Sequence, residues 1–360
     1  MSNSLQLTNI GELVTANSAG VERYQNSSLC IEDGKISSIS DRNGDQIIDC
    51  GGKMVTAGFV DSHTHPVFYN KRDEEYRMRL AGATYEEIAE KGGGIISSVE
   101  GVRNASKEAL VEKVMQRMDR FIAGGTTTIE AKSGYGLNTD SELKSLSVID
   151  EVNQNHPIDM VPTFMGAHAF PKEFSNDHDA YIDLICNEMI PAVTDQGVAI
   201  FNDVFCEDKY FTVDQSRRIL EAGREHGLKP RLHADEFVDS GAAVLAGEIN
   251  AFSADHLMAV SEIGIRSIVD NDVVATLLPG TTFFLGKSNY APARKLIDNN
   301  VTVALATDFN PGSSHIQSIP FIMTLACMHM EMTVEEAFQS VTYNGAKALG
   351  MENEIGSIEV

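Results

Sequence analysis

The stretch GFVDSHTHPVF, residues 58–68, joins an apolar run to two histidines and a proline. Because side chains alternate between the two faces of a β-strand, His63 and His65 project from the same face. The whole chain has ten histidines, so two on one face at the end of a predicted strand form an unusual concentration. This pair indicates a polar, chemically active site, and its other members must come from elsewhere in the chain.

Further strands follow at intervals along the sequence. The predicted strands span residues 55–63, 126–132, 160–168, 198–205, 228–233, 251–256, 273–278 and 301–308. Amphipathic stretches such as 106–125 and 213–227 lie between them, with apolar residues at helical spacing and a glycine at the C-terminal end. Eight strands alternating with helices predict an α/β fold, a parallel (β/α)8 barrel of the TIM type.

Polar side chains occupy one place in this pattern, at or just beyond the C-terminal ends of the predicted strands. They are His63, His65, His168, His233, His256 and Asp308. Active sites of parallel barrels form on that face. One histidine at a strand end is more often structural than functional, but six polar positions from five strands indicate a shared site.

Imidazole and carboxylate groups are ligands that suit zinc or iron. His63 and His65, completed by His233 and Asp308, predict a metal site of three histidines and one carboxylate. A position left for water would make the metal catalytic, because the metal lowers the pKa of that water. Asp308 could accept the water's proton while His256 hydrogen-bonds the same water.

Charge and composition exclude several classes of function. The 360-residue chain has a formal net charge of −24, which disfavours nucleic acid as a partner because phosphate binding needs a basic surface. No apolar run approaches the roughly 18 residues of a membrane span, and MSNSLQLTNI lacks a signal-peptide pattern, so a cytoplasmic protein is predicted. Five dispersed cysteines are typical of thiols in a reducing compartment.

The N-terminal region differs from the rest. SSLCIEDGKISSIS predicts a hairpin that turns at Asp33 and Gly34. We therefore expect a small β-layer over residues 1–54, the barrel over 55–350, and a return toward the small layer over 351–360.

Four motifs together resemble the amidohydrolase superfamily: GFVDSHTH, HADE (233–236), ADH (254–256) and ATDFNPGS (306–313). The resemblance implies a metal-bearing barrel with a small β-sandwich built from both chain ends. The blocks EAKSGYGL, PTFMGAHA, DFNPGSS and the long run after His65 resemble a narrower branch. That branch opens the ring of imidazolone-propionate to N-formimidoyl-L-glutamate in histidine degradation.

The resemblance also implies which residues form the site. It places a single Zn²⁺ or Fe³⁺ ion per subunit on His63, His65, His233 and Asp308. It places substrate contacts on Arg72, Tyr135, His168, Glu236 and Ser313, and product contacts on Tyr135, Asn310 and Gly312. Asp308, His256 and Glu236 are the implied proton-transfer residues, and a homodimer is the implied assembly.

These positions have plausible chemistry and ordinary alternatives. Arg72 offers a planar fork for the propionate, although by itself it is typical of a surface arginine. Tyr135 lies between glycines that let the backbone approach a ligand. Glu236 could carry protons to the departing nitrogen, or could be an acid at a helix N-terminus. The NPGSS run is otherwise a good turn and helix cap.

Three alternatives are compatible with parts of the pattern. A mononuclear deaminase of a purine or pyrimidine uses the same ligand set, but a neutral base offers no carboxylate to Arg72. A binuclear hydrolase normally needs a lysine on the fourth strand, and VAIFNDVF has none. A non-enzymatic scaffold would have lost metal ligands, whereas all four are present.

The final residues, MENEIGSIEV, stand where the superfamily usually continues into further strands of the small domain. We therefore expect the small domain to lack its C-terminal strands in this chain, with unpaired strand edges as a consequence.

Overall fold

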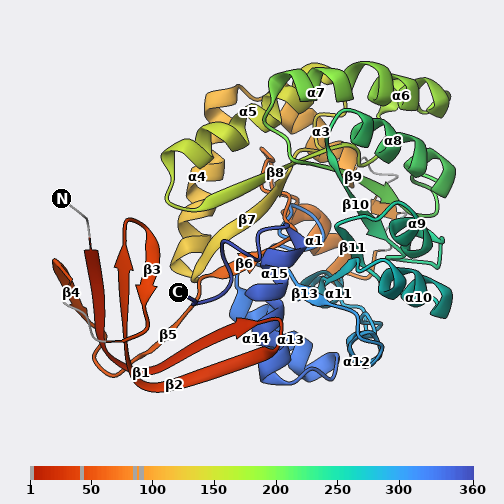
Figure 1. Ribbon diagram of the computed structural model, residues 1–360. Helices are drawn as coiled ribbons and strands as arrows, with labels where there is room; N and C mark the ends of the chain where they lie inside the picture. The colour runs from red at the N-terminus through yellow and green to blue at the C-terminus, as the bar shows by residue number, and fades with distance from the viewer. Residues whose placement is uncertain (1–3, 41–43, 84–86, 89–92) are drawn as a thin grey trace.

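The computed structural model describes residues 4–40, 44–83, 87–88 and 93–360. Its main feature is an eight-stranded sheet in which every neighbouring pair is parallel, in the order β13-β12-β11-β10-β9-β8-β7-β6 (Figure 1). The strands are β6 (Phe59–Asp61), β7 (Thr126–Lys132), β8 (Asp159–Ala167), β9 (Phe201–Cys206), β10 (Lys229–Ala234), β11 (Ser253–His256), β12 (Val274–Leu277) and β13 (Val303–Leu305). A barrel strand overlaps each of the eight predicted ranges, so the predicted α/β barrel is confirmed.

The two outer strands of this sheet meet through the segments that follow them. Thr64 and Phe309 form an isolated parallel bridge, and His65 N donates to Phe309 O at 2.8 Å. Asp308 N donates to His63 O at 3.1 Å. These contacts join the ends of β6 and β13 and bring the sheet close to a complete barrel.

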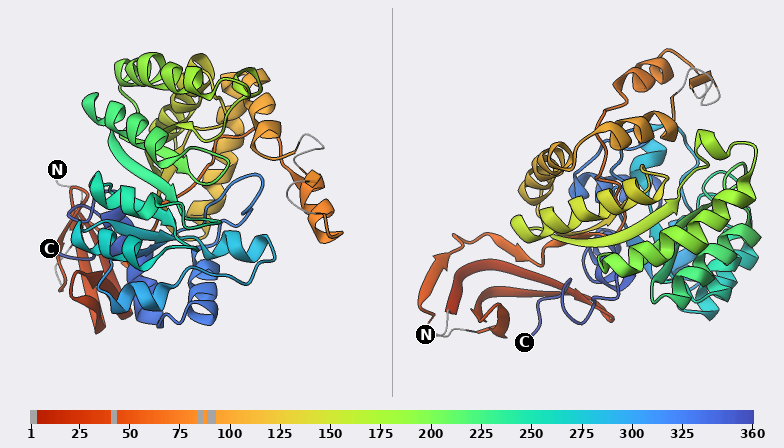
Figure 2. Two further views of the ribbon diagram at one scale, coloured as in Figure 1. Left: turned by 90° about the vertical axis from the view of Figure 1, so that its right-hand side faces the viewer. Right: turned by 90° about the horizontal axis from the view of Figure 1, so that it is seen from above.

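The helices of the described ranges lie around the barrel, most of them against its outer face (Figures 1 and 2). They are α1 (Asp73–Leu80), α3 (Ile95–Asn104), α4 (Lys107–Ala123), α5 (Thr139–Asn155), α6 (His178–Leu184), α7 (Ile190–Gln196), α8 (Val213–Glu225), α9 (Ala242–Glu248), α10 (Glu262–Asp270), α11 (Pro279–Phe284), α12 (Ala293–Asp298), α13 (Ile319–His329), α14 (Val334–Ser340) and α15 (Tyr343–Ala348). The largest apolar core cluster takes residues from both barrel strands and helices, including Ile129, Leu146 and Leu232. In Figure 2, α1 projects away from the barrel.

The amphipathic stretches 106–125 and 213–227 form helices that begin and end as their sequences indicate. Ser106 accepts a hydrogen bond from Ala109 N at the start of α4, and Thr212 forms a capping box with Gln215 at the start of α8. Gly125 and Gly227 follow the helices with φ of 88°, a conformation that glycine adopts without strain.

The N-terminal strands form a separate mixed sheet beside the barrel (Figure 1). It contains β1 (Ser4–Asn17), β2 (Gly20–Glu32), β3 (Lys35–Ser38), β4 (Gln46–Asp49) and β5 (Met54–Thr56). β2 and β3 are antiparallel around Asp33 (φ 51°) and Gly34 (φ 80°), so the predicted hairpin is confirmed with both turn residues at positive φ.

The single strand predicted over residues 55–63 is wrong, because the chain there contributes to both sheets. β5 pairs with β1 in the small sheet, whereas β6 pairs with β7 in the barrel. Ala57 and Gly58 separate β5 from β6. Both parts are apolar enough to look like one strand, and only the pairing partners distinguish them.

The end of the chain returns to the small sheet. Ile358 N donates to Thr15 Oγ1 at 2.7 Å, and the Ile358 side chain is buried with Ile10, Leu13 and Leu29. Among the helices of the described ranges, none is long and apolar enough to cross a membrane.

Candidate metal centre

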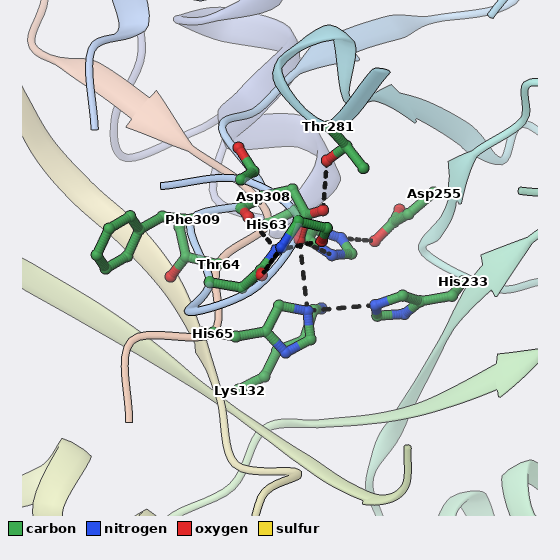
Figure 3. Close-up of polar contacts among 12 residues, drawn as sticks. His63, Thr64, His65, Lys132, His233, Asp255, Thr281, Asp308 and Phe309 are labelled. Atoms are coloured by element: carbon green, nitrogen blue, oxygen red, sulfur yellow. Dashed lines mark hydrogen bonds and ion pairs between the residues drawn. The ribbon is translucent and has the colours of Figure 1, made fainter. Parts of the chain in front are cut away.

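Four ionisable side chains predicted as metal ligands meet at one end of the barrel (Figure 3). His63 and His65 follow β6, His233 lies near the end of β10, and Asp308 follows β13. Each is at most 3% exposed. The barrel therefore brings together residues from three strands that are far apart in the sequence, as parallel topology requires of side chains at strand ends.

The histidine nitrogens are arranged as acceptors around a common point. His63 Nδ1 lies 2.6 Å from Asp255 Oδ2, and His233 Nδ1 lies 3.1 Å from Asp203 Oδ1. Because a carboxylate only accepts, both rings donate from Nδ1 and carry a lone pair on Nε2. Within the described residues, buried His63 Nε2 has no hydrogen-bond partner.

The other two ligands complete the donor set. His65 Nε2 lies 3.3 Å from His233 Nε2, and Asp308 Oδ1 lies 3.6 Å from the Nε2 atoms of both His63 and His65. Asp308 Oδ2 accepts a hydrogen bond from Thr281 Oγ1 at 2.5 Å, which leaves Oδ1 directed at the histidines. Two overlapping triads have ligand atoms within 4.8 Å of one another: His63, His65 and Asp308, and His63, His233 and His256. Imidazole nitrogens and a carboxylate oxygen suit a zinc or iron ion.

Burial keeps the histidines neutral. Desolvation lowers the pKa of His63, His65 and His256 well below the usual value, since an imidazolium there would lose its hydration. Neutral imidazole is the form that binds metals. Burial also raises the pKa of Asp308 to about 6, so a cation at this position would stabilise its carboxylate.

His256 and Glu236 face each other at the edge of this cluster. His256 ends β11 with a φ of 77°, an uncommon backbone conformation for a residue with a side chain. Its Nε2 atom lies 3.7 Å from Glu236 Oε2. Burial, and to a smaller extent the nearby Asp308 carboxylate, raise the pKa of Glu236 well above its usual value. Glu236 is thus suited to hold a proton.

Glu236 does not occupy a helix N-terminus, the alternative that its sequence position allowed. Asp235 has that role instead: its carboxylate accepts from Ser240 N and from Ala242 N and Ala243 N, the first two residues of α9, at 3.0–3.2 Å.

A cavity of about 520 Å³ opens onto the cluster. Every residue predicted for the site lines it except His63, which is fully buried beneath. The predicted residues on its wall are His65, Arg72, Tyr135, His168, His233, Glu236, His256, Asp308, Asn310, Gly312 and Ser313. The cavity also carries Arg79, Lys209 and Lys287, so this strongly acidic protein has local positive charge where an anion would enter.

The Arg72 side chain is only 9% exposed, so this residue belongs to the cavity wall and is not an ordinary surface arginine. Its Nε and Nη2 atoms donate to Glu75 at 2.8 and 2.6 Å. Glu75 is in turn held by Gly94 N at 3.1 Å. A side-chain Cβ at Gly312 would come within 2.2 Å of Arg72 Nη1, so a larger residue there would displace the guanidinium. The side of the Arg72 guanidinium that carries Nε and Nη2 is therefore paired with Glu75 within the protein.

Tyr135 and His168 form a neighbouring wall. The His65 and His168 rings stack with centroids 4.9 Å apart, and the Tyr135 ring lies 5.1 Å from that of His168. His168 Nδ1 donates to Gly134 O at 2.9 Å, so Nε2 is the ring nitrogen that remains to contact other groups. Buried Glu142 accepts from three backbone N–H groups of this loop and so fixes it.

Asn310 organises the loop after Asp308. Its Oδ1 accepts from Gly312 N and Ser313 N at 2.8 and 2.7 Å, and its Nδ2 donates to Asp308 O at 2.7 Å. The predicted turn is therefore confirmed, with the Asn310 side chain at its centre.

The residues behind the ligands were not predicted. They are Glu130, Lys132, Asp203, Arg231, Asp255 and Thr281, all fully buried. A signal was present in the sequence: a charged residue two positions before a site residue shares its face of the strand, as Arg231 does with His233. The fourth strand, which lacks a lysine, carries Asp203 opposite Lys132 of β7 at 2.7 Å.

These features define a class of protein. The model of the amidohydrolase family matches residues 54–360, and the chain belongs to that family. It is 50% identical over 346 residues to imidazolonepropionase of Geobacillus thermodenitrificans, covering 93% of this chain and 81% of that protein. It is also 50% identical over 314 residues to imidazolonepropionase of Alkaliphilus metalliredigens, covering 87% and 74%. Within the amidohydrolases, the chain belongs with the imidazolonepropionases.

Solved structures agree on the fold. A triazine hydrolase variant superposes with a TM-score of 0.80 at 16% identity, covering 99% of this chain and 84% of that one. Guanine deaminase from C. acetobutylicum, with bound guanine, superposes with a TM-score of 0.70 at 18% identity, covering 99% and 88%. At these identities the likeness concerns the architecture and not the substrate.

Proposed function

We propose that this protein hydrolyses the cyclic amide of 4-imidazolone-5-propanoate to N-formimidoyl-L-glutamate. The observation that carries the proposal is the 50% identity to an imidazolonepropionase over 93% of the chain. The site supports it independently: a cluster of metal-binding side chains adjoins a cavity that contains buried Arg72. A small substrate with a carboxylate tail suits such a cavity.

A bound metal ion would act as a Lewis acid and lower the pKa of water near the ring carbonyl. His63, His65, His233 and Asp308 would hold it. Asp308 is the proposed acceptor of the water's proton, because its Oδ1 atom faces the cluster while Oδ2 is fixed by Thr281. His256 Nε2, also without a hydrogen-bond partner in the described part of the chain, would donate to or orient the reacting oxygen.

Cleavage of the C–N bond requires a proton on the departing nitrogen. Glu236 is the proposed donor, since burial raises its pKa and so favours the protonated carboxyl beside His256. The carbonyl carbon gains the water oxygen and becomes the new carboxylate, and the nitrogen leaves as part of the formimidoyl group. Atoms and protons therefore balance with one water consumed.

The substrate's propionate would lie toward Arg72. The guanidinium lines the cavity beside Gly312 and is the proposed contact for the propionate. Tyr135, His168 and Ser313 line the same cavity and would contact the ring and its substituents. Asn310 and Gly312 belong to a loop that the Asn310 side chain holds in shape, and this loop would contact the product.

Two finer features are proposals as well. The metal is proposed to be Zn²⁺ or Fe³⁺, because three imidazoles and a carboxylate suit both. A cytoplasmic homodimer is the proposed state, and the five free cysteines fit a reducing compartment. Elemental analysis of the purified protein and light scattering on the full chain test these points.

The proposal is tested with the metal-loaded full chain and imidazolone-propionate. We expect loss of the imidazolone absorbance with formation of N-formimidoyl-L-glutamate, and no ammonia. Guanine and cytosine serve as control substrates, because a deaminase would release ammonia from one of them. Ammonia release without ring opening would contradict the proposal.

A further inference from the structure

Two of the ligand histidines are supported by fully buried carboxylates. Asp255 accepts from His63 Nδ1 at 2.6 Å, and Asp203 faces His233 Nδ1 at 3.1 Å. Asp203 also accepts from His233 N at 3.2 Å. Each carboxylate can therefore fix both the orientation of a ring and the nitrogen that carries its proton.

Each carboxylate in turn contacts a fully buried cation. Lys132 Nζ lies 2.7 Å from Asp203 Oδ2, and Arg231 Nη2 lies 3.2 Å from Asp255 Oδ2. Each chain of cation, carboxylate and histidine, called a relay below, crosses the barrel. One runs from Lys132 on β7 through Asp203 on β9 to His233 on β10. The other runs from Arg231 on β10 through Asp255 on β11 to His63 after β6. Figure 3 shows Lys132 and Asp255 on the two sides of the histidine cluster.

The same two cations also secure the backbone around His63. Arg231 Nη2 donates to Ser62 O at 2.7 Å. Lys132 Nζ pairs with Glu130 at 2.8 Å, and Glu130 Oε2 accepts from Thr64 N at 3.1 Å. Residues on both sides of His63 are thus tied to buried charge. A purely apolar barrel core would provide none of these contacts.

We propose that Lys132 and Arg231 are positioning residues of the metal centre. Lys132 holds Asp203 against His233, and Arg231 holds Asp255 against His63, so that both rings present Nε2 to the metal. This inference rests on the metal centre of the proposed function. Removing either cation leaves a buried carboxylate without the partner that holds it in place, and that carboxylate reorients. It then no longer fixes the ring.

His65 provides an internal contrast. Its Nδ1 atom is buried and has no hydrogen-bond partner within the described ranges. Stacking on His168 and the bridge at Thr64 position this ring instead. Each relay therefore acts on one ligand histidine, Lys132 on His233 and Arg231 on His63. Loss of one relay should disturb mainly the ring that it contacts.

The test uses metal-stripped full-length protein titrated with Zn²⁺ against a competing chelator. Lys132→Met is expected to weaken Zn²⁺ affinity by about 10- to 100-fold, as loss of residues that orient metal ligands typically does. Lys144→Met is the matched control, because Lys144 donates to the carbonyls of Val102, Arg103 and Ala105 away from the metal. Its affinity is expected to equal that of the unmodified chain.

Two further readouts separate positioning from general stability. Nitrogen NMR of the imidazoles should show His233 protonated at Nδ1 in the metal-free protein and a tautomer mixture after Lys132→Met. In a double-mutant cycle, Lys132→Met and Asp203→Asn should not add, since they act on one ring. If Lys132→Met does not fold, Lys132→Gln keeps a donor for Asp203 and gives the same readouts with a smaller loss.

Unchanged Zn²⁺ affinity in a folded Lys132 variant, or weakened affinity with an unchanged His233 tautomer, would overturn the inference. Failure of the proposed function gives a different result. In that case the unmodified chain binds Zn²⁺ and the variants weaken binding, but imidazolone-propionate is not opened.

Discussion

Asp308 has two proposed roles in the site, as a metal ligand and as the acceptor of the water's proton. It is a proposed ligand, is 3% exposed, and keeps one oxygen bonded to Thr281 while the other faces two imidazoles. Asp308→Asn retains the shape but cannot accept a proton. We expect turnover to fall by roughly 100-fold or more at saturating Zn²⁺, the usual scale of general-base loss.

The matched control for Asp308 is Thr281→Val, which removes only the hydrogen bond to Oδ2. Its turnover is expected to fall far less, because the carboxylate remains. Steady-state assays and metal content on both variants provide the measurement. Near-normal turnover of folded Asp308→Asn would exclude Asp308 as the base.

Arg72 is expected to act on binding and not on chemistry. Arg72→Met removes the buried guanidinium, and the lost charged hydrogen bonds predict an increase in KM of roughly 30- to 100-fold with little change in kcat. Arg77→Met is the control, because Arg77 forms a similar i,i+3 pair with Glu74 on the same helix but is exposed. A similar KM for both variants would place the propionate elsewhere.

His168 predicts a pH effect on stability whose sign follows from its pKa. Burial, with a further contribution from His233, lowers that pKa to about 3 in the folded protein, whereas the unfolded value is near 6.5. Below pH 6.5 the unfolded chain binds a proton that the folded chain does not. This residue therefore lowers stability by roughly 1.4 kcal/mol per pH unit as the pH falls from 6.5 toward 3.

His168→Gln removes that term. As the pH falls from 6.5 to 5, the free energy of unfolding of the variant should therefore rise relative to that of the unmodified chain. Above pH 7.5 the difference between the two should stay constant. Urea unfolding of metal-stripped protein at several pH values measures the difference. A difference that does not vary with pH would mean that His168 titrates normally in the folded protein.

The residues of the site differ in how far sequence could predict them. His63, His65, His233 and Asp308 stand at strand ends, where polar residues interrupt apolar runs and are easily recognised. Lys132 and Asp203 lie inside strands, where a charge usually argues against burial. Their burial depends on partners from other strands, and no local pattern specifies such partners. Resemblance to relatives likewise indicated Arg72 but not its pairing with Glu75.

Among the elements, the hairpin of β2 and β3 was the most predictable part of the small sheet. Its turn needs two consecutive residues at positive φ, and Asp33 and Gly34 supply them. Gly34→Ala is expected to cost about 1 kcal/mol, because alanine at positive φ is strained while its Cβ meets no neighbour within 4 Å. Asp33→Gly, which introduces no such strain, is the control.

Hydrogen exchange measures this hairpin effect locally. Amides of the Ile31 and Ile36 pair should exchange about fivefold faster in Gly34→Ala, the factor that corresponds to about 1 kcal/mol. Barrel amides should keep their rates, since no barrel strand pairs with the hairpin. Equal exchange in both variants would mean that the turn contributes little to sheet stability.

Element boundaries were less predictable than element types. Local propensity identifies apolar, β-branched runs, but pairing decides where a strand starts and to which sheet it belongs. Residues 54–61 illustrate this, because β5 and β6 are adjacent in sequence yet pair with β1 and β7. The predicted strand over 301–308 is likewise reduced to Val303–Leu305, since the backbone then turns to place Asp308 at a φ of 50°.

At the scale of the whole molecule, the metal ligands coincide with the seam that closes the barrel. His63 and His65 follow β6 and Asp308 follows β13, and these are the outer strands of the parallel sheet. Across the seam, Thr64 bridges Phe309, His65 N donates to Phe309 O and Asp308 N donates to His63 O. The Asp61 carboxylate also accepts from Thr307 N and Thr307 Oγ1. A metal ion held by ligands from both sides would link the two ends of the sheet.

Removing the metal should therefore loosen the seam more than the rest of the barrel. Linkage predicts that metal stabilises the folded state by about 4 kcal/mol when free metal exceeds Kd by 1,000-fold. Uniform global destabilisation would raise exchange of the most protected amides everywhere. A seam that opens locally would instead raise it mainly in peptides covering residues 59–66 and 303–310.

Hydrogen–deuterium exchange of the chelator-treated and Zn²⁺-reloaded full chain distinguishes these outcomes. Peptides over residues 160–167 are the internal control, because β8 pairs with both β7 and β9 and contributes no ligand. We expect the seam peptides to gain the most deuterium without metal and to regain protection on reloading. Equal gains in the control peptides would mean that metal loss destabilises the whole barrel uniformly, and no gain in either set would mean that the barrel closes independently of the metal.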